Sequence, residues 1–294
     1  MAELTTSCEF EHPSRSLILD PSDKVWKNHF TNGKMEEIKA EMLPPVTELP
    51  DEVLDYIDSY EGLHDLEKLY NHYTRFRFHP CKQAALSGAH GCIIRGLKLY
   101  FNDYLSKPRT EADLMKHVWC LINYCYDGSI IDVSTQNYRY IQQQTLLETG
   151  VKFPKTLKDM FMELVEHAPS KIRVIQTNAF MISGNNPSSL RMSHMIVDSP
   201  AGLVCRVIKL PKWLEYPRCA ERFTNQIKPI LQVVWNAKTS MEQVDRTVGM
   251  DTGVQSIAYG VEHSPVLPHF FNPTPATNNC KKRKRSTLDE TQYV

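Results

Sequence analysis

Five consecutive cations late in the sequence, Lys281-Lys282-Arg283-Lys284-Arg285, form the pattern that most directly indicates a chemistry. They lie in a segment rich in Pro, Asn, Thr and Ser, which is poorly suited to burying a hydrophobic core. An extended basic run of this kind is read by an acid-lined groove, most commonly that of a nuclear import receptor. We therefore predict an import signal at 281–285 and a nuclear location. Direct contact with RNA, DNA or acidic lipid is the alternative.

A second cationic pattern, Arg75-Phe76-Arg77-Phe78-His79, alternates charges with aromatic rings. Alternation of this kind suits a nucleic-acid strand, because rings stack on bases and cations contact phosphates. The same pattern is typical of a half-buried strand or a helix end, and we favour that structural interpretation. Both interpretations stay open from the sequence alone.

The residue types that hold metals or act as nucleophiles show no productive spacing. The eight cysteines form no CxxC pair, and the histidines show neither HxH nor HExxH spacing. We expect reduced thiols in the cytosol or nucleus, and we interpret Cys92 as a packing residue rather than a nucleophile. Carboxylates gather on the first long predicted helix. We interpret them as a solvated acidic face, which is a simpler explanation than a metal site. They are Asp55, Asp58, Glu61, Asp65 and Glu67. We expect no cofactor and no metal.

Charge and hydropathy narrow the class of protein further. The chain has 34 Lys and Arg and 34 Asp and Glu, so its net charge is zero. Without residues 281–285 the remainder carries 29 cations against 34 acids, a net charge of −5. This mildly acidic body argues against a non-specific coat on DNA, although a local basic patch stays possible. No window of eighteen apolar residues predicts a membrane span, and residues 1–8 lack the features of a signal peptide.

Helices dominate the first half of the predicted architecture. Residues 1–50 look loosely structured apart from a short helix at Lys34–Glu41. Apolar residues at intervals of three and four predict a helix over 52–74, with Asp51 as its N-cap and a possible break at Gly62. We expect a loop from Pro80 through Gly88–Gly91, followed by a helix over 93–105.

Thr110 opens the clearest predicted helix, because Thr110-Glu111-Ala112-Asp113 resembles a capping box. Its apolar face contains Leu114, Val118, Leu121, Ile122 and Cys125.

Strands dominate the second half. A short strand is expected at Ile130–Val133, then a loop or weak strand over 134–145 and a helix over 156–167. Lys171–Ser183, Leu190–Val197 and Leu203–Leu210 read as strands, and the last two should pair as a hairpin across the turn at 198–202. A helix over 219–236, kinked at Pro229, follows. This order predicts an α+β fold: one domain over 51–248, with N-terminal helices and then a mixed sheet with flanking helices. A disordered tail is expected over 249–294.

Several blocks of the sequence resemble recurring blocks in large families of uncharacterised fungal proteins. The first is Glu111-Ala112-Asp113-Leu114 with Val118-Trp119 and Asp127-Gly128-Ser129-Ile130. The second is Lys152-Phe153-Pro154-Lys155-Thr156-Leu157-Lys158-Asp159-Met160-Phe161. Ile182-Ser183-Gly184 and Gly202-Leu203-Val204-Cys205-Arg206 are two further blocks, and the resemblance covers roughly residues 50–245. Some members of these families are similar to the PD-(D/E)XK nuclease-like fold, in which carboxylates hold Mg²⁺ and a Lys stabilises developing charge.

That resemblance implies a candidate catalytic set for an alternative function. Glu111 stands at the position of the helical acid, Asp132 at that of the strand acid, and Glu148 with Lys152 at that of the final pair. Glu148 and Lys152 are four residues apart instead of two, and Gly150 interrupts the segment, so we interpret the site as lost. The leading hypothesis is a non-catalytic nuclear protein that acts through protein or nucleic-acid contacts. The alternative is a Mg²⁺-dependent nuclease, or a degenerate remnant of one.

Overall fold

A computed structural model describes residues 12–41, 45–126, 151–183, 190–202 and 204–252. It is an α+β fold with a mixed five-stranded sheet and flanking helices, as the sequence predicted. The predicted strand at 130–133, the loop at 134–145 and the tail from residue 253 onward lie outside the described residues. Residues 249–252, which we had assigned to the tail, form the last turn of a helix.

The segment before residue 50 is more structured than the sequence suggested. It contains η1 (Pro13–Ser16), β1 (Ile18–Leu19), η2 (Lys24–Asn28) and α2 (Asn32–Ala40). The last of these agrees with the predicted short helix. Strand β1 pairs in parallel with β4 (Cys205–Lys209), so this segment contributes an edge of the sheet. The prolines misled the prediction, because local sequence does not show a pairing with a strand almost 190 residues away.

The predicted first long helix is two helices, α3 (Asp51–Asp58) and α4 (Leu66–Tyr73). Gly62 lies between them with φ +76°, a conformation that glycine adopts at little cost. The side chain of Asp65 caps α4 by accepting from the backbone N–H of Lys68 at 3.0 Å. Pro50, not Asp51, occupies the N-cap position of α3.

Helix α5 (Ala84–Phe101) corrects the prediction of a loop at Gly88–Gly91, because both glycines lie inside it. They face α7 (Leu121–Tyr126), which packs against α5. A Cβ at position 88 would lie 2.7 Å from the carbonyl oxygen of Tyr124. Glycine is therefore used here for close helix packing and not for a turn, which the sequence pattern does not distinguish.

Helix α6 (Glu111–His117) begins as predicted, with Thr110 as its N-cap. The Thr110 hydroxyl donates to Asp113 Oδ2 at 2.7 Å and accepts from the Asp113 backbone N–H at 3.2 Å. The single predicted helix is nevertheless divided into α6 and α7. Trp119, Leu121 and Ile122 at the junction are buried, with exposed fractions of 2%, 1% and 3%, as their apolar spacing predicted.

The sheet has the strand order β1-β4-β3-β2, with the short β5 (Leu214–Glu215) paired to β3. The predicted hairpin is confirmed, because β3 (Arg191–Asp198) and β4 pair antiparallel across a turn in which Gly202 has φ +65°. Strand β2 (Gln176–Ser183) begins later than predicted. Residues 169–171 form a 3-10 helix, η6, and backbone hydrogen bonds from Val174 and Ile175 return to Lys171.

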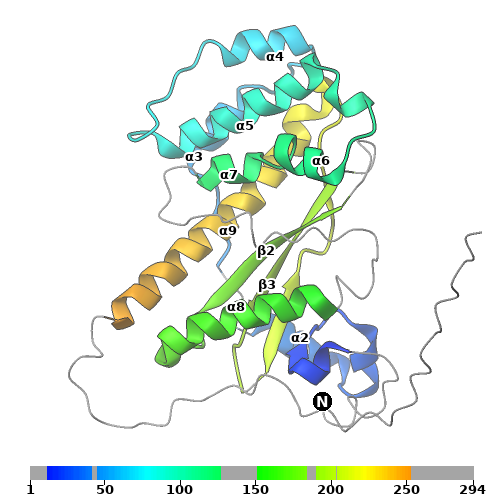
Figure 1. Ribbon diagram of the computed structural model, residues 1–294, viewed down its shortest axis with the longest axis vertical. Coiled ribbons are helices and arrows are strands. Elements are labelled where there is room, and N and C mark those ends of the chain that lie inside the picture. Colours follow the sequence, from blue (N-terminus) through cyan, green and yellow to red (C-terminus); the bar gives the residue numbers. More distant parts are fainter. Residues whose placement is uncertain (1–11, 42–44, 127–150, 184–189, 203, 253–294) are drawn as a thin grey trace, which may run out of the picture.

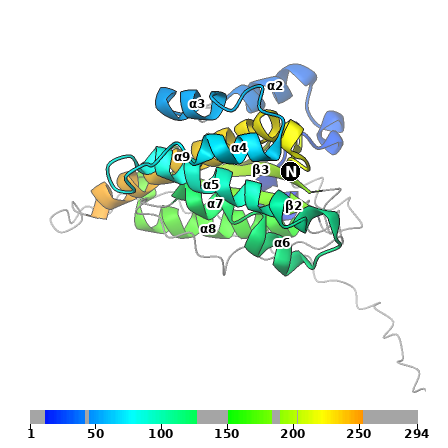
Figure 2. The ribbon, with the colours of Figure 1, turned by 90° about the horizontal axis from the view of Figure 1, so that it is seen from above.

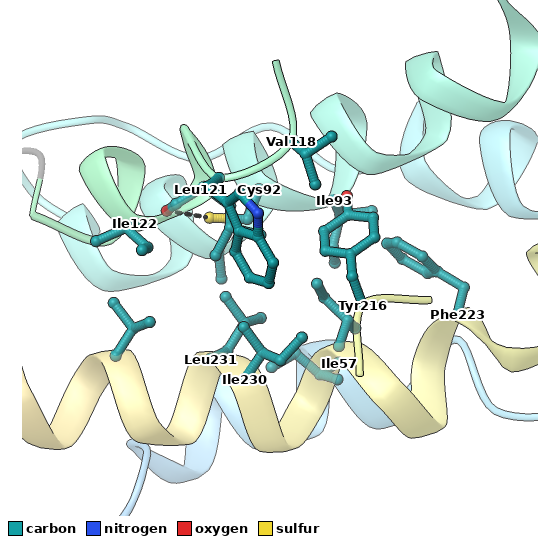
Figure 3. Packing of buried hydrophobic residues seen from close by; sticks show 14 of the residues in the cluster. Ile57, Cys92, Ile93, Val118, Leu121, Ile122, Tyr216, Phe223, Ile230 and Leu231 are labelled. Atoms are coloured by element: carbon teal, nitrogen blue, oxygen red, sulfur yellow. Dashed lines mark hydrogen bonds between the residues drawn. The ribbon is translucent and has the colours of Figure 1, made fainter. Parts of the chain in front are cut away.

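Helices cover both faces of the sheet (Figures 1 and 2). On one face, Met181 and Met195 belong to a core with Phe161 of α8 (Phe153–His167). On the other, Phe180 and Met192 belong to the larger core that includes α5, α7 and the first half of α9 (Phe223–Thr252). Figure 3 shows this larger core between the helices. Pro229 lies inside α9, where the sequence predicted a kink or restart.

Candidate nucleic-acid interface

Charge is strongly segregated within the helical half of the molecule. Residues 68–102 contain six Lys and Arg and no Asp or Glu, although the whole chain is neutral. All six side chains are exposed to solvent. They are Lys68, Arg75, Arg77, Lys82, Arg95 and Lys98; we call the surface of α4, α5 and their connection that bears them the basic face. Clustered exposed cations in a stretch of sequence without carboxylates are the electrostatic footprint expected for a polyanion.

Helix α5 is the platform of this face. Residues 84, 87, 91, 95 and 98 recur at three and four, so they lie along one side of the helix, and all of them are half-buried or exposed. Its 18 residues give a length of about 27 Å. Glu67 and Asp103 are the nearest carboxylates in sequence on either side of the basic face. The platform is therefore long, and the charged residues of α5 itself are all cations.

Tyr124 of α7 anchors one of the cations. The Nε of Arg95 donates to the Tyr124 hydroxyl at 2.9 Å, and the Arg95 guanidinium lies 5.4 Å from the centre of the Tyr124 ring. A Cβ at position 91 would approach the same ring to 3.2 Å, so Gly91 allows the ring to lie against α5. This anchoring holds the guanidinium at the surface in an ordered position.

Two aromatic rings are exposed on the same two helices as three of these cations. Phe101 of α5 is 49% exposed and Tyr70 of α4 is 39% exposed. Their ring centres are 5.4 Å apart at an interplanar angle of 84°. Exposed rings beside cations are what single-stranded nucleic acid uses, because bases stack on the rings while phosphates contact the cations.

The alternating segment Arg75–His79 agrees in part with each of the two interpretations that the sequence left open. Phe76 and Phe78 are half-buried, and each makes an edge contact with Tyr56 at 5.1 Å and 5.0 Å. Arg75 and Arg77 point to solvent. The rings therefore pack against the body, as in the structural interpretation, and only the cations remain for an external partner.

A polar and aromatic layer supports the basic face from below. The hydroxyl of Tyr56 lies 2.8 Å from that of Tyr60 and 2.5 Å from Nδ1 of His90, and Tyr73 stacks on His90 with ring centres 4.0 Å apart. Burial raises the pKa of Tyr56 and Tyr60 and lowers the pKa of His90. All three groups are therefore uncharged near neutral pH, which suits a supporting role for the surface cations above them.

The carboxylate cluster of α3, the turn after it and the first turn of α4 agrees with the solvated-face interpretation. Asp55, Glu61, Asp65 and Glu67 are exposed, and Asp58 pairs with Lys228 of α9 at 2.5 Å. Among the described residues no group of three or more His, Cys, Asp or Glu side chains is arranged to hold a metal ion. Residues 51–67 contain seven acids and no Lys or Arg, so an acidic segment directly precedes the basic face.

Two of the four residues of the alternative nuclease site lie in the described part of the chain. Glu111 is the first residue of α6 and Lys152 is the N-cap of α8, whereas Asp132 and Glu148 lie outside the described residues. The predicted import signal at 281–285 also lies outside them. No helix in the described part of the chain is long and apolar enough to span a membrane.

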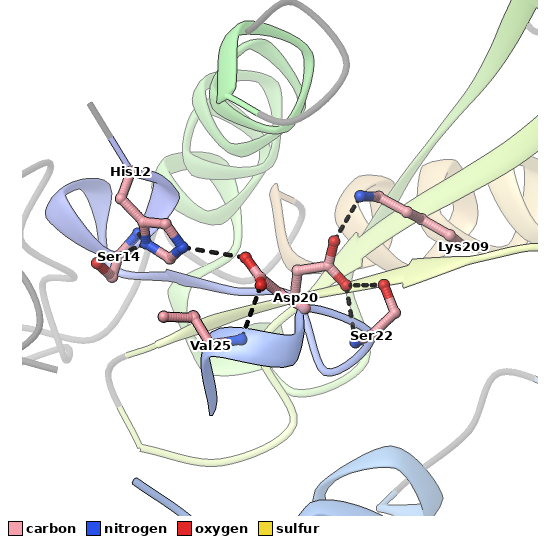
Figure 4. A network of polar contacts seen from close by, with 7 residues as sticks. His12, Ser14, Asp20, Ser22, Val25 and Lys209 are labelled. Atoms are coloured by element: carbon pink, nitrogen blue, oxygen red, sulfur yellow. Dashed lines mark hydrogen bonds and ion pairs between the residues drawn. The ribbon is translucent and has the colours of Figure 1, made fainter. Parts of the chain in front are cut away.

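A serine, a histidine and an aspartate that the sequence analysis did not single out meet near the N-terminal segment (Figure 4). His12 Nδ1 lies 2.8 Å from Ser14 Oγ, and His12 Nε2 lies 3.1 Å from Asp23 Oδ2. In a serine hydrolase the serine meets Nε2 and the aspartate meets Nδ1, the reverse of this order. Ser14 is fully buried, and its backbone N–H also donates to His12 Nδ1 at 3.2 Å. His12 caps η1, and Asp23 caps η2 by accepting from the backbone N–H of Val25 at 3.0 Å, so we assign the trio a structural role.

Two further polar groups lie inside the sheet layer. His194 donates to Asn178 Oδ1 at 2.9 Å, and Asn178 donates to Ser240 of α9 at 3.0 Å. Asp198 forms a buried ion pair with Arg206, whose exposed fraction is 2%. Both groups are too buried to meet a substrate, so we assign them to stability.

A cavity of about 10 Å³ next to α9 has room for about one water molecule. Its lining is largely apolar, so it does not suit a metabolite. The lining residues are Leu49, Val53, Ala85, Ala89, Cys125, Leu231 and Trp235.

Most of the basic face was missed at the level of sequence. The sequence feature that could have revealed it is the run of 35 residues without a carboxylate. That feature is hidden when net charge is calculated over the whole acidic body.

No family model matches the chain, and no curated protein and no solved structure matches it either.

Proposed function

We propose that this chain is a nuclear protein that binds single-stranded nucleic acid through its basic face and acts by binding instead of catalysis. The observation that carries the proposal is the basic face itself. Six exposed cations lie in a stretch without a carboxylate, beside the exposed rings of Tyr70 and Phe101. The nuclear location rests on the predicted import signal at 281–285, which an import receptor would read.

Single-stranded nucleic acid suits this face better than a duplex. A duplex reader inserts a helix or a strand into a groove, and most of its base contacts are made by polar side chains. Here the strip along α5 begins with the small residues Ala84 and Ser87 and continues to Arg95 and Lys98, with aromatic rings at one end. Between them, the Tyr124 ring lies against Gly91. Stacking on rings and phosphate contact along a shallow strip is the mode of sequence-tolerant single-strand binding.

The direct test is fluorescence anisotropy of labelled single-stranded RNA and DNA oligonucleotides with the full chain. The test variant is Arg77→Glu with Lys98→Glu, because both side chains are exposed and lie at separate places on the basic face. The matched control is Lys27→Glu with Lys212→Glu, which changes the net charge equally at exposed sites outside it. We expect the test variant to raise Kd at least tenfold and the control to leave it within about twofold.

The dependence on salt gives a second readout. Each phosphate contact on a single strand contributes about −0.7 to the slope of log affinity against log salt, so losing two contacts should flatten the slope by about 1.4. Equal binding by test and control variants would contradict the proposal. Salt-sensitive self-association without nucleic-acid binding would indicate instead that the basic face meets the acidic segment 51–67 of a second copy. Mg²⁺-dependent cleavage of the oligonucleotide would favour the nuclease alternative.

A further inference from the structure

Two cysteines on neighbouring helices place their sulfur atoms in contact. Cys92 Sγ of α5 lies 3.7 Å from Cys125 Sγ of α7. Cys92 is buried with an exposed fraction of 1%, and Cys125 is half-buried. The two residues are 33 positions apart, so the pairing is a property of the tertiary fold. The sequence offered no CxxC pair to suggest it.

The helix packing explains why the thiols meet. Gly88 and Gly91 lack side chains that would separate α5 from Tyr124 of α7. Cys92 comes one turn after Gly88, and its thiol donates to the carbonyl oxygen of Leu121 at 3.2 Å (Figure 3). Leu121 and Cys125 are one turn apart on α7. The Cys92 thiol therefore lies against a single side of α7 and next to the second sulfur.

We propose that Cys92 and Cys125 form an oxidisable dithiol, a modification site at which a peroxide converts the two thiols into a reversible disulfide. A disulfide requires a sulfur–sulfur distance of about 2.05 Å, so the sulfurs must approach by roughly 1.7 Å. Rotation of the two side chains supplies that movement. The proposal is independent of the nucleic-acid function.

The reaction proceeds in two balanced steps with hydrogen peroxide as the oxidant. The Cys125 thiolate, on the more exposed residue, attacks one peroxide oxygen; the O–O bond breaks, a sulfenic acid forms, and the departing hydroxide takes a proton to become water. The Cys92 sulfur then attacks the sulfenic sulfur, forming the S–S bond as the S–O bond breaks and a second water leaves. Two thiols lose two electrons and two protons, and one peroxide becomes two waters. A dithiol reductant reverses the modification.

The test treats the full chain with hydrogen peroxide, blocks the remaining thiols by alkylation in denaturant, and maps the peptides by mass spectrometry. We expect a linked pair containing Cys92 and Cys125, lighter than the two peptides by two hydrogen atoms and lost after dithiothreitol. Closing the loop between these residues should also raise Tm, and the reductant should reverse the rise. The result that overturns the proposal is recovery of both residues as alkylated thiols under conditions that oxidise the exposed Cys81.

Three variants make the assignment specific. Cys81→Ser should keep the link, whereas Cys125→Ala and Cys92→Ala should abolish it. Circular dichroism reports whether each variant folds. If Cys92→Ala, which changes a buried residue, does not fold, Cys125→Ala alone tests the assignment. A phenylarsenical, which bridges two adjacent thiols, should add once to the unaltered chain at Cys92 and Cys125. A linked pair that involves any other cysteine in place of either residue would refute the site.

Discussion

The carbonyl oxygen of Tyr124 lies so close to Gly88 that a Cβ at position 88 would be only 2.7 Å away from it. Only glycine therefore fits at this position without a shift. The contact joins α5 to the backbone of α7, which cannot move aside like a flexible side chain. Gly88→Ala should therefore lower the free energy of unfolding by about 1–3 kcal/mol through overpacking. Urea unfolding measures the change. Gly33→Ala is the matched control, because nothing lies within 4 Å of that site in α2 and alanine should stabilise it by up to about 1 kcal/mol.

Leu121 tests the assignment of the core face that the sequence predicted. Its exposed fraction is 1%, and it packs in the larger core with α5 and α9. Leu121→Ala should cost about 2–5 kcal/mol, measured by chemical denaturation. Asn123 is exposed on the same short helix, and Asn123→Ala should stay within about 0.5 kcal/mol. If both variants lose a similar free energy of unfolding, α7 is sensitive to any substitution, and burial of Leu121 is not the cause of the loss.

Arg206 ties the N-terminal segment to the sheet. Its Nε and Nη2 donate to the Asp198 carboxylate at 3.0 Å and 2.5 Å, and its Nη1 donates to the carbonyl oxygens of Ile38 and Glu41 at 2.7 Å and 2.5 Å. Arg206→Ala leaves a buried carboxylate without its partner and should cost about 3–5 kcal/mol. The double variant Arg206→Met, Asp198→Leu removes both charges and should recover much of that loss. If it is as unstable as the single variant, the unpaired charge is not the cause.

His194 should make stability depend on pH. Burial lowers its pKa to about 4 from the ordinary 6.5, so the folded protein keeps this ring neutral. As pH falls from 6.5 to 4, this imidazole becomes protonated in the unfolded chain but stays neutral in the folded chain. The free energy of unfolding therefore falls by about 3 kcal/mol. Denaturant titrations at several pH values measure this slope. His72 and His90, whose pKa values are also lowered, add to it in the same direction. His194→Gln should therefore flatten the curve only in part, and a variant with the unchanged slope would refute the assignment.

If residues 281–285 are an import signal, replacing them should change the location of the protein without changing its fold. Replacing 281–285 by five alanines should move a large fluorescent fusion from nucleus to cytoplasm and leave Tm unchanged. Ser286→Asp with Thr287→Asp adds two negative charges beside the five cations and should move part of the protein. The nuclear-to-cytoplasmic intensity ratio is the measurement. If the alanine replacement leaves this ratio unchanged, the basic run is better explained as a direct contact for RNA, DNA or acidic lipid.

Local pattern predicted the elements that depend on neighbouring residues. Thr110 with Asp113 predicted the start of α6, and the apolar spacing through Leu121 and Ile122 predicted a buried face. The turn at 198–202 predicted the β3–β4 hairpin, because turn residues and flanking strands are adjacent in the chain. These features succeed for the same physical reason: the partners that stabilise them lie within a few residues or across one tight turn.

Distant contacts decided the rest. Glycines at 88 and 91 read as a loop in sequence, yet the approach of α7 makes them helical packing positions, and the same approach brings Cys92 to Cys125. The proline-rich segment before residue 50 gains order from β1 pairing with β4 and from Arg206 at the end of α2. The charges of the basic face were present in the sequence, but only the packing of α4 on α5 shows which aromatic rings stay exposed beside them. Sequence alone therefore predicted the α+β class, which the fold confirms, and an import signal at 281–285, which stays a prediction. The tertiary structure decided the surface and the thiol pair, because both depend on residues brought together by helix packing.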